Sequence, residues 1–329
     1  MMADFFICDI AAAIPKDDMA TMEHPVFSLS TRPDRRVLRY AHKGVTVAIT
    51  PSVKGLATIH DKDVLIFCIS QLVAALNAGR PVARRVELVA HDLLMACGRE
   101  TSGDGYRRLC DAFERLAGTR ITTNIPTGET VTTSGFGLIE SWEIVRRTRS
   151  GRMVSVSVTL SEWLLRAVLA RSVLTLSPDY FTLRKPLERR LYELARKHCG
   201  RQARWQISMA VLCAKSGSAS PLRVFRKMVR DIAAGDRLPD YTLEVVEGDL
   251  VLVRPRSVVE DEIPATGLPP LSATTVEAAR RAAPGWDIYA LEADWRAYWQ
   301  ATGRPHLRVP AKAFIAYCAK RAESPDGGP

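Results

Sequence analysis

The chain has 329 residues, a formal net charge of +10 at pH 7 and 47% hydrophobic residues. That length holds about two domains of roughly 100–200 residues each, and the hydrophobic content excludes a largely disordered chain. No apolar stretch approaches the ~20 residues that span a bilayer, and Asp4 stands where an export signal carries a basic residue. We therefore expect a cytoplasmic protein without a membrane segment.

The seven cysteines are widely spaced and include no Cys-x-x-Cys pair. Most fall within apolar, periodic segments, which is typical of reduced, buried thiols. We expect neither a disulfide nor a bound metal ion.

Composition and periodicity divide the chain into five parts. We predict an N-terminal extension over residues 1–36, a first domain over 37–176, a second domain over 177–257, a linker over 258–283 and a helical tail over 284–322. The linker begins with an acidic, proline-rich stretch, and the tail carries Trp and Tyr residues at helical spacing. The extension is expected to be ordered because its apolar residues require burial, namely Phe5, Phe6, Val26, Phe27 and Leu29.

In the first domain, the sequence predicts three helices followed by a β-hairpin. Strands are expected over 40–49, 57–59, 86–89 and 120–125, helices over 64–77, 91–97, 105–117 and 162–170, and a Thr- and Gly-rich loop over 126–137. The hairpin covers 138–147 and 153–160, and its second strand alternates with a two-residue period. Asp61 or Asp63 is expected to cap the helix over 64–77.

The same order recurs in the second domain. Helices are expected over 186–200, 209–214 and 222–234, a short strand over 205–208, a turn over 215–220 and a hairpin over 241–246 and 250–253. Helix, helix, helix and hairpin is the order of a winged helix-turn-helix domain. The predicted fold class is therefore α+β, with two tandem winged helix-turn-helix domains and a small C-terminal helical tail.

Residues 184–230 carry the positive charge of the chain. They include thirteen Lys and Arg residues and two Glu residues, a net charge of +11, which exceeds the +10 of the whole chain. The remainder is therefore close to neutral. A basic segment of this kind is typical of a surface that binds a polyanion such as DNA.

The third helix of the second domain separates charged from apolar residues. Its basic residues share one face, at spacings of i, i+3, i+4 and i+7: Arg223, Arg226, Lys227 and Arg230. Its apolar residues share the opposite face: Leu222, Phe225, Val229 and Ile232. A recognition helix needs this division, because one face packs in the core while the other enters the major groove. The competing interpretation is a solvated cationic face, although such faces usually include acids.

Further residues around this helix are predicted to contact DNA. The turn before the helix offers Lys215, Ser216 and Ser218 to phosphate groups. The hairpin ends with Arg254 and Arg256. These two arginines either reach a flanking phosphate or the minor groove, or they form a solvated strand end.

The first domain has a weaker basic pattern. Arg107 and Arg108 are candidate DNA contacts, but acids share their helix. Arg107–Asp111 and Asp111–Arg115 are spaced as i,i+4 ion pairs, so this face is expected to be partly neutralised. The hairpin tip has four arginines without an acid among them and is expected to probe a phosphate or the minor groove. These are Arg146, Arg147, Arg149 and Arg152.

The sequence contains no catalytic constellation. It has no G-x-x-x-x-G-K-[ST] motif for binding a nucleoside triphosphate, and its six histidines include no His-x-His or His-Glu-x-x-His pair. We therefore predict a protein that is not an enzyme, with no catalytic residue, cofactor or metal site.

Five stretches of the chain resemble the plasmid replication initiator protein A family. They are residues 18–30 (DMATMEHPVFSLS), 49–63 (ITPSVKGLATIHDKD), 177–181 (SPDYF), 188–198 (ERRLYELARKH) and the start of the tail at 284–286 (PGW). The resemblance extends from about Asp4 to about Cys318. It implies an iteron-binding protein with two winged-helix domains.

The resemblance also implies a function. Proteins of this family bind repeated sites at a plasmid origin, melt nearby AT-rich DNA and help to recruit host replication proteins. Related initiators bind repeats as monomers and repress their own gene as dimers, and their second winged helix makes the stronger sequence-specific contacts. The partners implied are double-stranded origin DNA, the host initiator, the replicative helicase and a second copy of the chain, and no cofactor is implied.

Two other functions remain open at this point. A winged-helix transcriptional repressor would use the same residues, although two DNA-binding units in tandem favour a long, repeated site over a short palindrome. A rolling-circle nicking enzyme belongs to a different class, and the sequence shows no metal site for strand cleavage by a tyrosine.

Overall fold

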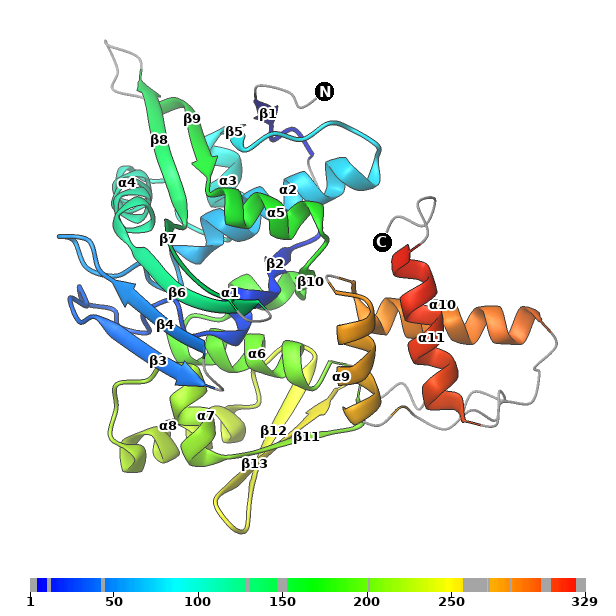
Figure 1. Cartoon of the computed structure of the whole chain (residues 1–329). Helices are drawn as coiled ribbons and strands as arrows, with labels where there is room; N and C mark the ends of the chain where they lie inside the picture. The colour runs from blue at the N-terminus through cyan, green and yellow to red at the C-terminus, as the bar shows by residue number, and fades with distance from the viewer. Residues whose placement is uncertain are drawn as a thin grey trace.

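The computed structural model describes residues 5–10, 13–42, 45–127, 130–146, 153–200, 202–256, 271, 273–284, 286–302 and 309–323. Over these residues the chain is a mixed α+β protein in which small sheets and helices pack together (Figure 1). Of the helices in these ranges, none combines the length and the apolar composition needed to cross a membrane.

Two halves of the chain repeat one order of helices and strands. The first half consists of α2 (Lys62–Asn77), β5 (Arg85–Leu88), α3 (Ala90–Ala96), α4 (Gly103–Gly118), β8 (Ile139–Arg146) and β9 (Met153–Leu160). The second half consists of α6 (Pro186–His198), β11 (Trp205–Ser208), α7 (Met209–Ser216), α8 (Leu222–Gly235), β12 (Tyr241–Val246) and β13 (Leu250–Pro255). In each half the short strand pairs antiparallel with the last strand, so β5 pairs with β9 and β11 pairs with β13. The order of helices and hairpin expected from the sequence is therefore present twice.

A four-stranded antiparallel sheet accompanies the first half, and the sequence did not predict it. Its strands are, in spatial order, β3 (Leu38–His42), β4 (Val45–Thr50), β6 (Arg120–Thr127) and β7 (Thr130–Gly137). The single strand expected over 40–49 is thus two strands, and most of the loop expected over 126–137 is β7. Glycine weakens a strand, but β7 pairs with β6 along its whole length, a contact that local composition does not reveal. No strand forms over 57–59, where Thr58 makes an isolated bridge with Ser28.

The N-terminal residues are built into both halves. They contain β1 (Phe6–Ile7), β2 (Lys16–Asp18) and α1 (Met19–Glu23). β1 runs parallel to β5, β2 pairs with β10 (Val173–Thr175), and α1 packs against α6. Phe6 and Phe27 are buried in the core of the first half, whereas Met22 is buried in that of the second. The described residues of the predicted extension over 1–36 thus contribute to both cores, although Phe5, expected to be buried, is 46% exposed.

Two short elements lie between the halves. They are the helix α5 (Glu162–Leu169) and the 3-10 turn η1 (Pro178–Thr182). The Ser161 side chain accepts a hydrogen bond from the Leu164 amide and so caps α5. These elements, together with β10, carry the chain from β9 to α6.

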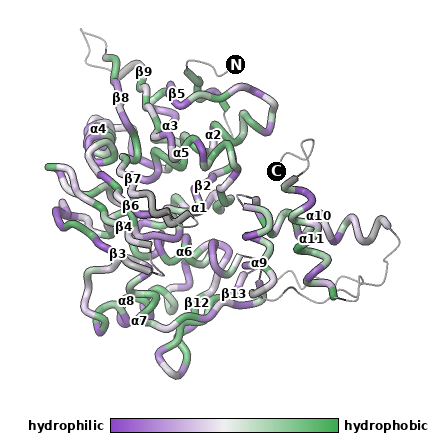
Figure 2. Tube along the Cα trace, viewed as in Figure 1, coloured by the Kyte–Doolittle hydropathy of each residue, from purple (hydrophilic) through white to green (hydrophobic). Residues whose placement is uncertain are grey.

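Hydrophobic side chains form three cores. The first surrounds α2, whose residues are buried along almost its whole length and are mostly apolar (Figure 2). The second joins α6, α7, α8 and the hairpin β12–β13. The third lies among α9 (Ala273–Ala282), α10 (Ile288–Ala301) and α11 (Pro310–Glu323). The predicted linker, 258–283, therefore ends in a helix, while residues 257–270 lie outside the described part of the chain.

Candidate nucleic-acid interface

Helix α8 buries one side and exposes the other. Phe225, Val229 and Ile232 are buried in the core of the second half. The helix follows Pro221 and ends at Asp236, whose left-handed φ of 45° stops it. The division between an apolar inner side and a polar outer side, expected from the sequence, is thus present in the structure.

The exposed side of α8 carries a row of three cations, Arg223, Lys227 and Arg230. None of them forms an ion pair with another described residue, and their spacing places them on one strip of the helix. Val224, which is 41% exposed, lies beside this strip. Asp231 is the one acid of α8, and it lies at the flank of the strip. We refer to Arg223, Lys227 and Arg230 as the cationic row.

Arg226 bonds to the hairpin turn instead of joining the cationic row. Its Nε and Nη2 donate to the Asp249 carboxylate at 2.8 and 2.7 Å. These hydrogen bonds lower the pKa of Asp249. Asp249 has a left-handed φ of 59° and lies between β12 and β13. Because a bidentate guanidinium–carboxylate pair has a defined geometry, Arg226 fixes the hairpin turn relative to α8.

The two arginines at the end of the hairpin also have partners within the protein. Arg254 Nη1 lies 2.7 Å from Glu244 Oε2 on the neighbouring strand. Arg256 donates from Nε to the Leu238 carbonyl at 2.9 Å and from Nη1 to the Asp236 carboxylate at 2.9 Å. Both arginines are therefore occupied in the free protein, and Arg256 ties the end of β13 to the end of α8.

The turn before α8 is held by its own hydrogen bonds. The Ser216 hydroxyl donates to the Cys213 carbonyl at 2.8 Å and accepts from the Ser218 amide at 3.3 Å. Gly217 has a φ of 72°, and a Cβ at this position would lie 2.6 Å from Pro25. Both the left-handed backbone and the lack of space disfavour a side chain at Gly217. The hydrogen bonds of Ser216 and Ser218 therefore hold a turn that requires glycine at its centre.

Lys215, the remaining predicted residue of this turn, is bound to α1. Its Nζ pairs with Glu23, and the same carboxylate lies 3.3 Å from both Lys197 and His198. Burial raises the pKa of Glu23, but the nearby His198, the charge of Lys197 and the hydrogen bond from Lys215 outweigh it and hold that pKa well below its ordinary value. Lys215 therefore supports the contact between α1 and the second half.

The arginines in the middle of α6 are buried, although they belong to the basic segment 184–230. The side chains of Arg189 and Arg190 are each 3% exposed. Arg189 pairs with Asp63 near the start of α2. Arg190 lies 3.2 Å from Glu193 and donates to backbone carbonyls of α1 and α7 at 2.9 and 2.8 Å. These cations hold segments of the protein together and present no charge to solvent.

Two neighbouring basic residues of α4 share one acid. Arg107 and Arg108 are exposed, and both pair with Asp104. The i,i+4 pairs expected between Arg107 and Asp111 and between Asp111 and Arg115 do not form among the described residues. Asp111 and Arg115 instead pair with residues of the segment that leads into α2, because α4 packs close enough to that segment for long-range ion pairs.

The predicted arginines of the β8–β9 tip lie outside the described residues. Arg146 ends β8, but its side chain is not described, and Arg147, Arg149 and Arg152 fall within the undescribed stretch 147–152. Their proposed contact with DNA thus rests on the sequence alone.

A second exposed basic segment was not predicted from the sequence. Arg32, Arg35 and Arg39 are exposed in and before β3. The Tyr40 hydroxyl of β3 lies 3.2 Å from where a Cβ of Gly217 would be, so β3 adjoins the turn that leads into α8. Four arginines within residues 32–39 were a visible signal. Their position beside α8 depends on a contact between residues far apart in the chain.

A cationic helix packed beside a β-hairpin in an α+β unit is typical of DNA-binding proteins. The sequence matches the profile of the family described as Replication initiator protein A over residues 16–243. It is 36% identical over 244 residues to a relative named "Putative replication protein" in Wigglesworthia glossinidia brevipalpis, and the match covers 73% of this chain and 88% of that protein. The chain belongs to the Replication initiator protein A family, whose function is the initiation of replication.

Crystal structures of domains 2 and 3 of RctB share the fold. Two of them match with TM-scores of 0.54 and 0.51 at sequence identities of 14% and 15%. The matches cover 72% and 74% of this chain and 98% and 99% of the RctB chains. The similarity therefore covers nearly three quarters of this chain and concerns its architecture. Within the described ranges, no group of three or more His, Cys, Asp or Glu side chains is placed to bind a metal ion.

Proposed function

We propose that this protein is a replication initiator that binds double-stranded DNA sequence-specifically, with α8 as its recognition helix. The cationic row of α8 is the observation that supports this most strongly. An α-helix fits the major groove, where arginine bonds guanine O6 and N7 bidentately. Because the row has no ion pair with a described residue, its charge is available to DNA without breaking an internal contact.

In this proposal each half is a winged helix-turn-helix domain. α7 and α8 form the helix-turn-helix of the second domain (177–257), and the hairpin β12–β13 forms its wing. α3, α4 and the hairpin β8–β9 are the counterparts in the first domain (37–176). The pair between Arg226 and Asp249 positions the second wing relative to the recognition helix. Arg226 is therefore assigned a positioning role, in place of the base contact that its spacing suggested.

The other predicted residues take supporting roles in the proposal. The turn containing Ser216 and Ser218 presents its backbone amides to a phosphate. Arg107 and Arg108 share a single carboxylate and retain a net positive charge for the DNA backbone. Arg254 and Arg256 contact DNA only if they exchange their present partners.

Family membership supports a wider role for the protein in replication. We propose that it binds repeats at a replication origin, promotes melting of AT-rich DNA and helps to recruit the host initiator and the replicative helicase. As a dimer with a second copy of the chain, it represses its own gene. These steps follow from the resemblance to the family and add no residue to the interface.

A footprint on the DNA that flanks the gene tests the proposed interface. We expect the full chain to protect a long site composed of repeats and the variant Arg223→Ala/Lys227→Ala/Arg230→Ala to lose this protection. The matched control is Arg84→Ala/Arg85→Ala/Arg166→Ala, which removes the same charge from exposed arginines that pair with glutamates. Equal protection by the α8 variant and the wild type would contradict the assignment of α8.

Deletion of the gene from its replicon separates initiation from simple repression. An initiator is required for maintenance, so we expect the plasmid to be lost and to be restored by the gene supplied in trans. Persistence of the plasmid without the gene would favour a transcriptional repressor that uses the same α8 surface.

A further inference from the structure

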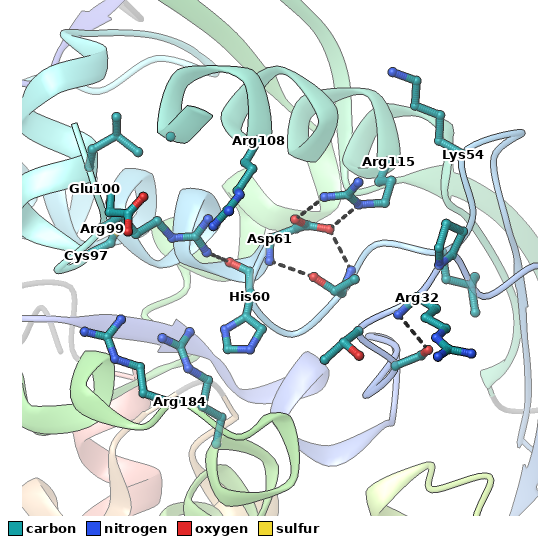
Figure 3. Close-up of a pocket in the computed structure, with 18 of the residues that line it drawn as sticks. Arg32, Lys54, His60, Asp61, Cys97, Arg99, Glu100, Arg108, Arg115 and Arg184 are labelled. Atoms are coloured by element: carbon teal, nitrogen blue, oxygen red, sulfur yellow. Dashed lines mark hydrogen bonds and ion pairs between the residues drawn. The ribbon is translucent and has the colours of Figure 1, made fainter. Parts of the chain in front are cut away.

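A cavity of about 590 Å³ lies where the first half meets the start of α6. Its wall combines the loop after α1, the segment that leads into α2, the turn between α3 and α4, α4 itself and residues at the start of α6 (Figure 3). The volume falls within the range of about 300–1,000 Å³ that is typical of small-molecule sites. No residue of α8 lines it, so the cavity is separate from the cationic row.

Three guanidinium groups of the wall are held in place by two buried carboxylates. Arg115 donates from Nε and Nη2 to the two oxygens of Asp61 at 2.7 and 2.8 Å. Arg99 donates from Nη2 to one oxygen of Asp63 at 2.7 Å, and Arg189 pairs with the other. The Asp61 and Asp63 side chains are 3% and 1% exposed. The carboxylates are thus enclosed, while the arginines that they orient line the cavity.

These three arginines keep hydrogen-bond donors that no described residue accepts. A guanidinium has five N–H donors. Arg115 and Arg99 use Nε and Nη2, which leaves the Nη1 of each without a partner among the described residues. Arg189 uses Nε and Nη1, which leaves its Nη2. Donors fixed beside a cavity favour a ligand with several acceptor oxygens.

Two exposed arginines add to the positive charge at the rim. Arg32 and Arg184 line the cavity, and neither forms an ion pair with a described residue. In Figure 3 Arg184 lies across the cavity from Arg99 and Arg108. Because they have no partner to lose, both can turn toward an anion.

The charge of the cavity is positive after its acids are included. Seven basic residues and two acids, Asp61 and Glu100, line the cavity. Four more carboxylates, those of Asp63, Asp104, Asp111 and Glu114, pair with these basic residues, so one positive charge remains. His60, between the two sides in Figure 3, adds no charge near pH 7. Burial and the charges of Arg189 and Arg99 lower the pKa of its imidazole to about 4.

We propose that this cavity binds a small anion with at least two phosphate groups, either inorganic pyrophosphate or a nucleoside diphosphate. Arg99, Arg115 and Arg189 bind the phosphate oxygens through their remaining donors, and Arg32 and Arg184 close over them from the rim. The planar guanidinium matches phosphate geometry bidentately. Leu56 and Leu94 also line the cavity and offer an apolar wall to a nucleobase.

Calorimetric titration of the full chain with inorganic pyrophosphate and with ADP tests this site. We expect saturable binding, and we expect Arg32→Gln/Arg184→Gln to weaken it about tenfold or more, as the loss of charge-assisted contacts predicts. The variant removes exposed, unpaired side chains, so it is expected to fold; its circular dichroism spectrum confirms this. The matched control Arg223→Gln/Arg230→Gln removes the same charge from α8 and is expected to leave both affinities within about twofold of the wild type.

Three results would overturn the proposal. The first is no binding of either anion at about 1 mM, the weak limit of a specific site. The second is an equal loss of affinity in the rim variant and the α8 control, which would show that only net charge matters. The third is displacement of pyrophosphate by duplex DNA, which would make the cavity part of the DNA interface. Tighter binding of ADP than of pyrophosphate supports a site that includes the apolar wall.

Discussion

Helices α6 and α8 are both basic, yet their cations serve opposite purposes. On α6, Arg189 and Arg190 are each 3% exposed and are bound to acids and to backbone carbonyls. On α8, Arg223 and Arg230 face solvent and have no ion pair with a described residue. The same residue type therefore stabilises the fold in one helix and remains available for a ligand in the other.

The surroundings of the two helices explain the difference. α6 is contacted by α1 and α7, and the acids that neutralise its arginines come from α2 and from α6 itself. α8 is covered on one side only. Because a buried charge is costly unless it is paired, every cation that packing encloses must meet an acid, whereas an exposed cation need not. The net charge of a segment therefore does not locate a binding surface.

The largest effect that tests this comparison is expected on stability. Arg190→Met keeps most of the side-chain volume but removes the donor to Glu193 and to four backbone carbonyls. We expect the free energy of unfolding to fall by about 3–5 kcal/mol, as for other broken buried ion pairs. Arg230→Met on α8 is the control and should change it by less than about 0.5 kcal/mol. Urea denaturation measures both, and similar midpoints for the two variants would remove the distinction between the helices.

The second test uses pH, because His60 lies near the buried arginine Arg189 of α6. Burial and the charges of Arg189 and Arg99 lower the pKa of His60 from 6.5 to about 4. Between these values the unfolded chain binds a proton that the folded chain does not, so stability falls as the pH is lowered from 6.5 to 4. A depression of this size corresponds to about 3 kcal/mol.

Substitution isolates the contribution of His60. His60→Gln should flatten the dependence of unfolding free energy on pH between 6.5 and 4, whereas His91→Gln, at an exposed histidine, should not. Guanidinium denaturation at a series of pH values measures this slope. An unchanged slope in His60→Gln would mean that the positive field of the buried arginines does not act on this imidazole.

The third test concerns DNA affinity. If Arg230 contacts a base, Arg230→Ala should weaken specific binding by about 1–3 kcal/mol. A phosphate contact would instead lower the salt slope by about one unit for all sequences. Fluorescence anisotropy on the footprinted site at several salt concentrations distinguishes the two contacts. No change in either quantity would contradict the proposed placement of α8.

The smallest effect is expected at the pair that links α8 to the hairpin. Asp249→Asn removes a negative charge from the interface and releases Arg226 from its carboxylate partner. We expect the salt dependence of non-specific DNA binding to become steeper by about one unit, since one more cation can displace a counterion. The salt dependence of specific binding should steepen less, because the wing is no longer fixed to α8. A shallower slope would show that Arg226 does not reach DNA even when it is free.

Local signals in the sequence predicted the elements of the second half within a few residues. The helix expected over 222–234 is Leu222–Gly235, and the one expected over 186–200 is Pro186–His198. Proline at the start, glycine near the end and a period of 3.6 residues are properties of the segment itself. β7 carries no such signal, because its pairing with β6 depends on that strand and not on its own Gly- and Thr-rich composition.

The same limit applied to the candidate site. Spacing alone placed Arg223, Arg226, Lys227 and Arg230 on one face, but it did not show that Arg226 is held by Asp249. It also did not show that Asp61 and Asp63, expected as helix caps, orient the arginines of a cavity instead. Both pairings join residues more than twenty positions apart, beyond the reach of any helical period.

By itself the sequence determined that α8 has a buried apolar side and a cationic side, because the order of residues along a helix fixes which of them share a face. Tertiary structure decided which cations of the chain remain unpaired. Ion pairs depend on distance in space: packing brings Asp63 to Arg189 and Asp249 to Arg226, whereas Arg223 and Arg230 form no ion pair with a described residue. The charge available to DNA is therefore set by the fold that surrounds each helix.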